Sequence, residues 1–373
     1  MLKRICLLAL LVGCILLSCR AVASERLELK GQRIVFLGDS ITDGNSYPLM
    51  VRQALKEAGK DLPVLINAGI GGDTAAGMIK RLERDVFVHR PTLVSISVGI
   101  NDVLRKVETR DYVTTVGAIA EQIRSKNIPL LILTTSVLGK KHEAADKRLE
   151  EFNAALREIA IKTGARLGDV NQRMNAARAA GETVLEEDEV HPNYAGQRLM
   201  ARTVLDALGC ESVPLPAKFE VELIPDIVRK WQIVPVPDKT PPLMAETLAK
   251  LAPDGKWKTL RLPEKETLEH WWQDQERQRG FAMSLDKLAG KASTYYGVAT
   301  FGQPKARSAF INTGGQLKSV WLNGRNVYKA SAEWTGWHAG RERIPVELPA
   351  GTNTLVIETG SQFFLSISET NDW

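Results

Sequence analysis

The chain has 373 residues, of which 44% are hydrophobic and 25% are charged. This composition is that of an ordinary globular protein and excludes a collagen-like or broadly disordered chain. The length favours two domains over one. The formal net charge is +5, but the first 23 residues carry three unbalanced positive charges. The remaining +2 gives no electrostatic reason to expect nucleic-acid binding.

The first 23 residues have the features of a bacterial secretory signal. Two basic residues precede an apolar run over residues 5–17, and Ala-Val-Ala follows at residues 21–23. The apolar run is too short for a comfortable membrane span. The segment therefore predicts a secreted or periplasmic protein with no stable membrane span after cleavage. One alternative is a lipoprotein anchored through Cys19. Another is an N-terminal segment that is not cleaved and remains as a membrane anchor.

The next part of the chain alternates apolar runs with amphipathic stretches. The apolar runs predict buried strands at residues 33–37, 64–66, 93–98 and 130–134. The amphipathic stretches predict helices at residues 49–58, 76–84, 113–123 and 147–163, and from near Pro192 to near Gly209. This alternation is typical of an α/β domain with a parallel sheet covered by helices on both faces. We expect this domain to occupy residues 24–212.

The composition changes after residue 212. Closely spaced prolines indicate a linker or extended region, which we assign to residues 213–289. Beyond it, Asn323-Gly324 lies between two apolar runs and predicts a tight hairpin. A second hairpin is expected from Ile344–Leu348 and Leu355–Ile357. Residues 290–373 are therefore predicted to form a smaller accessory β-sandwich domain.

Four short polar segments carry the candidate chemistry. Three of them follow predicted strands and the fourth precedes the last helix of the α/β domain. They are Gly38-Asp39-Ser40, Gly71-Gly72-Asp73, Asn101-Asp102 and Asp188-Glu189-Val190-His191. In a parallel sheet, active sites lie at the carboxyl ends of the strands. The four segments are therefore expected to meet at one edge of the sheet.

The residue types in these segments fit nucleophilic catalysis. A serine such as Ser40 attacks well only when a base accepts its proton, and His191 is a suitable base. Asp188 lies three residues away and can orient the imidazole. The backbone N–H groups of Ser40 and Gly72 and the side-chain amide of Asn101 can stabilise an oxyanion.

In order and approximate spacing, these segments resemble the conserved blocks of the SGNH (GDSL-type) hydrolase family over residues 31–209. The resemblance implies a flavodoxin-like three-layer α/β/α sandwich and ester hydrolysis with no cofactor and no metal. It implies that Ser40 is the nucleophile and that Asp188 and His191 complete the triad. It also implies an oxyanion hole formed by Ser40, Gly72 and Asn101. The run at residues 67–74 resembles the branch that includes thioesterase-like and carbohydrate-acetyl esterases.

Other polar residues have simpler interpretations. The G-x-S-x-G elbow of the larger α/β-hydrolase fold is absent around Ser40. Asp39 and Asp73 are expected to stabilise turns. Cys210 is the single cysteine after residue 23 and is expected to be a buried, inert thiol. The remaining histidines show no metal-ligand spacing. They are His89, His142, His270 and His338.

Three functions remain open at this point. The first is a carboxylic ester hydrolase that removes acyl groups, above all acetyl groups, from a carbohydrate or another small ester. The second is a lipid acylhydrolase or thioesterase with the same triad. The third is a glycan-binding protein without catalysis. Aromatic residues of the C-terminal half can stack on sugars, although packing in a small core is the more common role. They are Trp271, Trp272, Trp321, Trp334 and Trp337.

Overall fold

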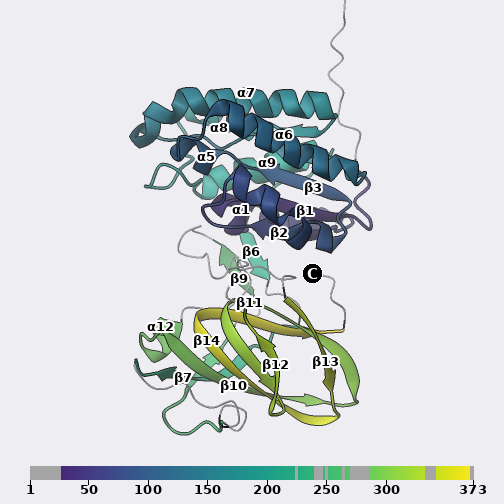
Figure 1. Ribbon diagram of the computed structural model, residues 1–373, viewed down its shortest axis with the longest axis vertical. Helices are drawn as coiled ribbons and strands as arrows, with labels where there is room; N and C mark the ends of the chain where they lie inside the picture. The colour runs from purple at the N-terminus through teal and green to yellow at the C-terminus, as the bar shows by residue number, and fades with distance from the viewer. Residues whose placement is uncertain are drawn as a thin grey trace, which may run out of the picture.

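The computed structural model describes residues 27–222, 226–238, 247, 251–262, 265–268, 285–331 and 342–369. The predicted secretory signal, with Cys19, lies outside these residues. The chain forms two domains that follow one another along the longest axis of the molecule (Figure 1). The short strands β6 (Phe219–Glu222) and β9 (Lys265–Leu268) pair with each other between the two domains. None of the helices in the described ranges combines the length and the apolar character that a membrane crossing needs.

The N-terminal domain contains a parallel sheet of five strands. Their spatial order is β2-β1-β3-β4-β5, which is the flavodoxin-like order. The strands are β1 (Arg33–Gly38), β2 (Val64–Gly69), β3 (Leu93–Ser97), β4 (Leu130–Leu133) and β5 (Arg166–Gly168). Because β1 lies between β2 and β3, the loops that follow these three strands are neighbours. The predicted α/β/α class is confirmed.

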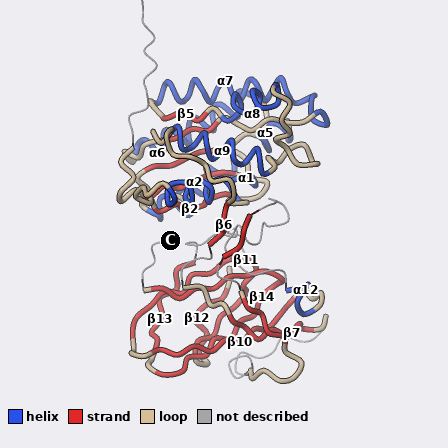
Figure 2. Tube along the Cα trace, turned by 180° about the vertical axis from the view of Figure 1, so that it is seen from behind, coloured by secondary structure: helices blue, strands red, loops and turns tan. Residues whose placement is uncertain are grey.

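Helices cover both faces of this sheet (Figure 2). α2 packs against α9, and α6 packs against α7. The α-helices are α1 (Ser40–Asp43), α2 (Ser46–Glu57), α3 (Ala75–Met78), α4 (Leu82–Asp85), α5 (Ile100–Leu104), α6 (Thr109–Ser125), α7 (Asp146–Thr163), α8 (Val170–Ala179) and α9 (Tyr194–Ala207). Short 3₁₀ turns are η1 (Ile79–Arg81), η2 (Phe87–His89) and η3 (Lys140–Ala145). Cover on both faces explains why residues 34–37 of β1 are apolar without alternation and fully buried.

The start of α9 differs from the expectation. Pro192 is not its first helical residue, because Asn193 caps the helix by accepting a hydrogen bond from the Gly196 N–H at 3.0 Å. The predicted end is correct, since Gly209 follows the helix with a φ of 75°. A glycine adopts this left-handed conformation without the steric cost of a side chain.

Two parts of this domain were not expected from the sequence. The helix predicted at residues 76–84 is broken into α3, η1 and α4. The strand β5 and the helix α8 were missed, because β5 is a three-residue strand, Arg-Leu-Gly, with no apolar run. Pairing of Leu131 with Arg166 extends the sheet to β5. Neighbouring strands, rather than local sequence, therefore define this edge.

The C-terminal domain is an antiparallel β-sandwich. Its strands have the order β12-β11-β14-β10-β7-β8, with β13 paired to β11. They are β7 (Lys230–Val236), β8 (Lys258–Arg261), β10 (Thr294–Gln303), β11 (Arg307–Leu322), β12 (Arg325–Lys329), β13 (Glu342–Leu348) and β14 (Gly351–Ser368), with the short helix α12 (Leu285–Ala289) beside them.

The long strands β11 and β14 join the two layers of the sandwich. The first half of β11 pairs with β13 and with the end of β14, whereas its second half pairs with β12 and with the start of β14. The ladder is irregular near Gly315, where β11 changes partners. An apolar cluster fills the domain, with Trp231 edge-on to Phe363 at a ring-centroid distance of 5.3 Å.

One hairpin prediction is confirmed and the other is wrong. Asn323 and Gly324 have φ values of 50° and 83° and connect β11 to β12, as expected for a type I′ turn. The strand containing Ile344–Leu348 does not pair with the strand after its turn. It pairs with the start of β11, while the residues that follow the turn pair with β10. The turn therefore connects two different ladders, which an alternating pattern cannot reveal.

The region assigned to a linker contributes to both domains. β7 and β8 lie within residues 213–289, and they are strands of the sandwich. Phe219, in the same region, is 2% exposed and belongs to the core of the N-terminal domain. Its ring lies edge-on to that of Tyr194 and beneath the guanidinium of Arg198. The packing of the first domain thus continues past residue 212.

Candidate active site

The catalytic candidates lie at the carboxyl edge of the parallel sheet. Ser40 follows β1 and opens α1, with Asp39 as the N-cap residue. Gly72 lies in the turn after β2, and Asn101 lies in the first turn of α5 after β3. His191 comes from the loop before α9. The adjacency of the three strands explains why segments far apart in sequence meet here.

Ser40, His191 and Asp188 form a continuous hydrogen-bonded chain. The Ser40 Oγ lies 2.8 Å from Nε2 of His191, and Nδ1 of His191 lies 2.6 Å from Oδ2 of Asp188. A carboxylate only accepts, so Nδ1 carries the imidazole proton and Nε2 is left to accept the proton of Ser40. This arrangement can generate a serine nucleophile.

The backbone of the loop holds Asp188 ionised. Its Oδ1 accepts hydrogen bonds from the N–H groups of Val190 and His191, each at 2.9 Å. Burial acts to raise the pKa of Asp188, but these N–H donors and the His191 side chain outweigh it and lower the pKa below its ordinary value. The carboxylate therefore remains charged where it orients His191.

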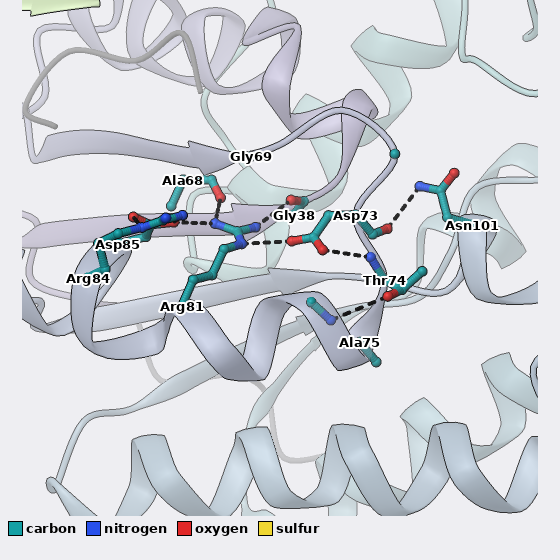
Figure 3. A network of polar contacts seen from close by, with 12 residues as sticks. Gly38, Ala68, Gly69, Asp73, Thr74, Ala75, Arg81, Arg84, Asp85 and Asn101 are labelled. Atoms are coloured by element: carbon teal, nitrogen blue, oxygen red, sulfur yellow. Dashed lines mark hydrogen bonds and ion pairs between the residues drawn. The ribbon is translucent and has the colours of Figure 1, made fainter. Parts of the chain in front are cut away.

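The candidate oxyanion donors Ser40, Gly72 and Asn101 follow the neighbouring strands β1, β2 and β3. Gly72 has a φ of 77°, a conformation that favours glycine. The Asn101 Nδ2 donates one hydrogen bond to the Asp73 carbonyl at 3.0 Å (Figure 3). An amide nitrogen carries two hydrogens, so this bond fixes the group and leaves the second hydrogen for a substrate oxygen. Arg105 Nη2 donates to the Gly72 carbonyl at 2.7 Å and steadies the same turn.

A buried arginine, Arg81, contacts the turn that carries Gly72 and Asp73 (Figure 3). Arg81 donates to Asp73 at 2.7 Å and to Asp85 at 3.1 Å. It also donates to the carbonyls of Ala68 and Gly38, at 2.7 and 3.0 Å. These carbonyls belong to the ends of β2 and β1. One guanidinium thus ties both strand ends to the turn that carries Gly72, a role that the sequence did not suggest.

Two further carboxyl groups are buried beneath the site. Asp39 accepts from the Ile41 N–H at 3.0 Å, which agrees with the turn-stabilising role expected for it. Burial raises the pKa of Asp39 to about 7 despite this bond, and the nearby Asp102 adds to the rise. Burial likewise raises the pKa of Asp102 to about 6. Asp102 accepts a hydrogen bond from the Ala75 N–H at the start of α3. This bond holds the chain that follows the turn carrying Gly72.

A second loop supports the loop that carries His191. The Gly139 N–H donates to the Glu189 carbonyl at 2.8 Å, and the Lys141 N–H donates to the Glu189 side chain at 2.6 Å. A Cβ atom at Gly139 would lie 2.4 Å from that of Glu189, so only glycine fits. His142 Nε2 lies 3.3 Å from the Asp188 carbonyl. No local sequence pattern indicated these contacts.

The remaining candidates lie apart from this chemistry. His89 is buried and its ring contacts Arg343 of the C-terminal domain, whereas His270 and His338 lie outside the described residues. Cys210 is buried, as expected. Within the described ranges, no group of three or more metal-ligating side chains comes together.

Comparison with known proteins defines the class. Residues 36–199 match the model of the GDSL-like Lipase/Acylhydrolase family. An acetylxylan esterase of Geobacillus stearothermophilus is 26% identical over 211 residues, which are 49% of this chain and 96% of that protein. An arylesterase of Vibrio mimicus is 29% identical over 141 residues, 35% of this chain and 68% of that protein. A crystal structure of the Geobacillus acetylxylan esterase is 24% identical, covers 51% of this chain and 100% of that chain, and has a TM-score of 0.46.

The N-terminal domain is thus a GDSL-like lipase/acylhydrolase domain of the SGNH type. The protein is a hydrolase of ester bonds.

Proposed function

We propose that this protein is a secreted or periplasmic serine esterase that removes acetyl groups from a carbohydrate. The observation that carries the catalytic part is the unbroken chain from Ser40 Oγ through His191 to Asp188, with contacts of 2.8 and 2.6 Å. The predicted secretory signal supports the location. Similarity to an acetylxylan esterase over almost its whole length supports the substrate class.

The geometry supports a two-stage mechanism. His191 Nε2 accepts the Ser40 proton as Oγ attacks the ester carbonyl. The oxyanion of the tetrahedral intermediate accepts hydrogen bonds from the N–H groups of Ser40 and Gly72 and from Asn101 Nδ2. His191 then donates this proton to the sugar oxygen as the C–O bond of the ester breaks. The sugar departs, and Ser40 retains the acyl group as an ester. A water molecule, deprotonated by His191, attacks that ester, and acetate leaves as Ser40 regains its proton.

The decisive experiment is acetate release from a panel of acetylated polysaccharides, run beside the variant Ser40→Ala. The wild-type protein is expected to release acetate from at least one of them, and the variant from none. Labelling of Ser40 by a serine-reactive phosphonate provides an independent readout. Full activity in Ser40→Ala would overturn the proposed mechanism.

A lipid acylhydrolase or thioesterase is the second candidate, because an Escherichia coli protein named Thioesterase 1/protease 1/lysophospholipase L1 is 28% identical over 85% of its own length. A series of 4-nitrophenyl esters with increasing acyl chain length separates the two. Preference for the acetyl ester favours the carbohydrate esterase, and preference for long chains favours the second candidate.

A further inference from the structure

A cavity lies in the C-terminal domain and takes no part in the proposed ester hydrolysis. It has a volume of about 660 Å³ and lies where β10 ends and β11 begins. This volume falls in the usual range of small-molecule sites, about 300–1,000 Å³. Basic side chains dominate its charged lining. They are Arg229, Lys230, Arg261 and Arg307, and the one acidic residue of the lining is Asp226.

The cavity forms where the chain crosses from one layer of the sandwich to the other. Residues 226–228 lie alongside the end of β14, with the Val228 N–H donating to the Leu365 carbonyl at 2.8 Å. The chain then enters β7, which pairs with β8 and β10. This crossover brings Arg229 and Lys230 to the opening, beside Arg261 at the end of β8.

Two features indicate that the basic cluster is built for an anion. Lys230 and Arg261 are exposed and lie directly opposite each other on β7 and β8. Like charges in such a cross-strand pair destabilise a sheet. In addition, the Nη1 atom of Arg307 is buried and has no hydrogen-bond partner among the described residues. This atom lies 3.9 Å from Oε1 of Glu369, whose side chain is exposed. A bound carboxylate would relieve both features.

The rest of the lining suggests a sugar as the carrier of that carboxylate. Phe301 is half-buried in the cavity wall, and hydroxyl and amide groups are present at Thr300 and Gln303. An aromatic ring can pack against the C–H face of a sugar, while polar groups bind its hydroxyls. Trp321, a candidate from the sequence, is only 5% exposed and belongs to a buried cluster.

We propose that this cavity binds a uronic acid residue of an acidic polysaccharide. The proposal rests on the proposed function, in which the substrate is a carbohydrate. The site would hold the polymer while the N-terminal domain removes acetyl groups from it. Its loss should therefore raise KM on an acidic acetylated polymer and leave kcat on small esters unchanged.

The test uses the full chain and unacetylated probes, so that binding is measured without hydrolysis. Isothermal titration calorimetry would compare an oligosaccharide of galacturonic acid with an oligosaccharide of galactose of the same length. The variant is Arg261→Gln/Arg307→Gln, and the matched control is Arg325→Gln, an exposed residue of β12 outside the cavity. Lys230→Gln is a second, milder variant. Thermal unfolding checks that each variant is folded, and relief of the like-charge pair should preserve the melting temperature of Lys230→Gln.

The wild-type protein should bind the acidic oligosaccharide at least about tenfold more tightly than the neutral one, because one charge-assisted hydrogen bond is worth about this factor. The double variant should lose at least about tenfold in affinity, and the control should match the wild type. Three results would overturn the proposal: no binding of the acidic probe, equal binding of the neutral probe, or unchanged affinity in the cavity variants.

Two competitors identify other ligands. Displacement by inorganic phosphate at the concentration at which galacturonic acid displaces the probe would indicate a simple anion site. Tight binding of single-stranded DNA that the same variants abolish would indicate a general polyanion surface. Either result rejects the sugar. Turnover of 4-nitrophenyl acetate by the wild-type protein is measured in parallel. If this protein binds the acidic oligosaccharide but does not hydrolyse the ester, only the proposed esterase mechanism is rejected.

Discussion

The two domains differ in where they place their charges. Among the described residues, every buried acidic or basic side chain belongs to the N-terminal domain. They are Asp39, Asp43, Arg81, Asp85, His89 and Asp102. The buried polar side chains of the sandwich are all uncharged asparagine, serine and threonine residues. Four of its basic residues line a cavity instead.

This difference follows from what each domain has to hold in place. The carboxyl edge of the parallel sheet brings loops together, and buried ions such as Arg81 fasten these loops through several hydrogen bonds each. Buried ions are costly unless every partner is present. The sandwich holds its strands by backbone ladders and apolar packing, so its charges can remain at the surface for a ligand.

The largest effect is expected from the proposed triad. His191→Ala should lower kcat on 4-nitrophenyl acetate by about 10⁴–10⁶-fold, because no group then accepts the Ser40 proton. Asp188→Asn should have a smaller effect, about 10²–10⁴-fold, because His191 remains in place. Arg307→Gln in the sandwich should leave this activity unchanged. A comparable loss of activity in Arg307→Gln would contradict the conclusion that the N-terminal domain alone carries out catalysis.

The next largest effect concerns the buried ion network. Arg81→Met should lower the free energy of unfolding by about 3–5 kcal/mol, because Asp73 and Asp85 lose a buried partner. The matched control is Arg124→Met, whose pair with Glu121 is exposed and should contribute less than about 1 kcal/mol. Urea denaturation followed by circular dichroism measures both. Equal effects would show that the buried network is not what stabilises this domain.

A pH dependence follows from the raised pKa of Asp39. Between about pH 4 and 7 the folded protein keeps this proton while the unfolded chain loses it, so stability falls as the pH rises and levels off above about 7. Asp39→Asn keeps an acceptor for Ile41 and removes this loss. The variant should therefore match the wild type near pH 4 and exceed it by up to about 4 kcal/mol at pH 8. If the free energy of unfolding depends on pH in the same way in both proteins, the raised pKa of Asp39 is contradicted.

The smallest effect sharpens the boundary between the domains. A chain ending at Ser212 retains the proposed triad but lacks the buried side chains of Val213 and Phe219, whereas a chain ending at Glu222 retains the triad and both side chains. The longer chain should be more stable by at least about 2 kcal/mol, because burying one such side chain contributes about 1.5–3 kcal/mol. Both should hydrolyse small esters. Equal melting temperatures would place the boundary at residue 212, and a folded but inactive longer chain would contradict independent catalysis.

The sequence alone determined the features that depend on local patterns. Continuous apolar runs identified the central strands, because strands covered on both faces have no polar side. The Asn323-Gly324 turn was predictable, since few residue pairs tolerate its backbone conformation. The segments around Ser40, Gly72, Asn101 and His191 were recognisable because each follows a strand or precedes a helix.

Only the tertiary structure decided which segments become neighbours. β5 is a strand because β4 offers it a ladder, and the strand at Ile344 pairs with β11 rather than with the strand after its turn. Arg81 and Gly139 acquire their roles from backbone groups distant in sequence. The basic cavity likewise combines five strands and a crossover segment. Strand pairing and burial depend on contacts between distant parts of the chain, and a local sequence pattern does not identify the segment that it will contact.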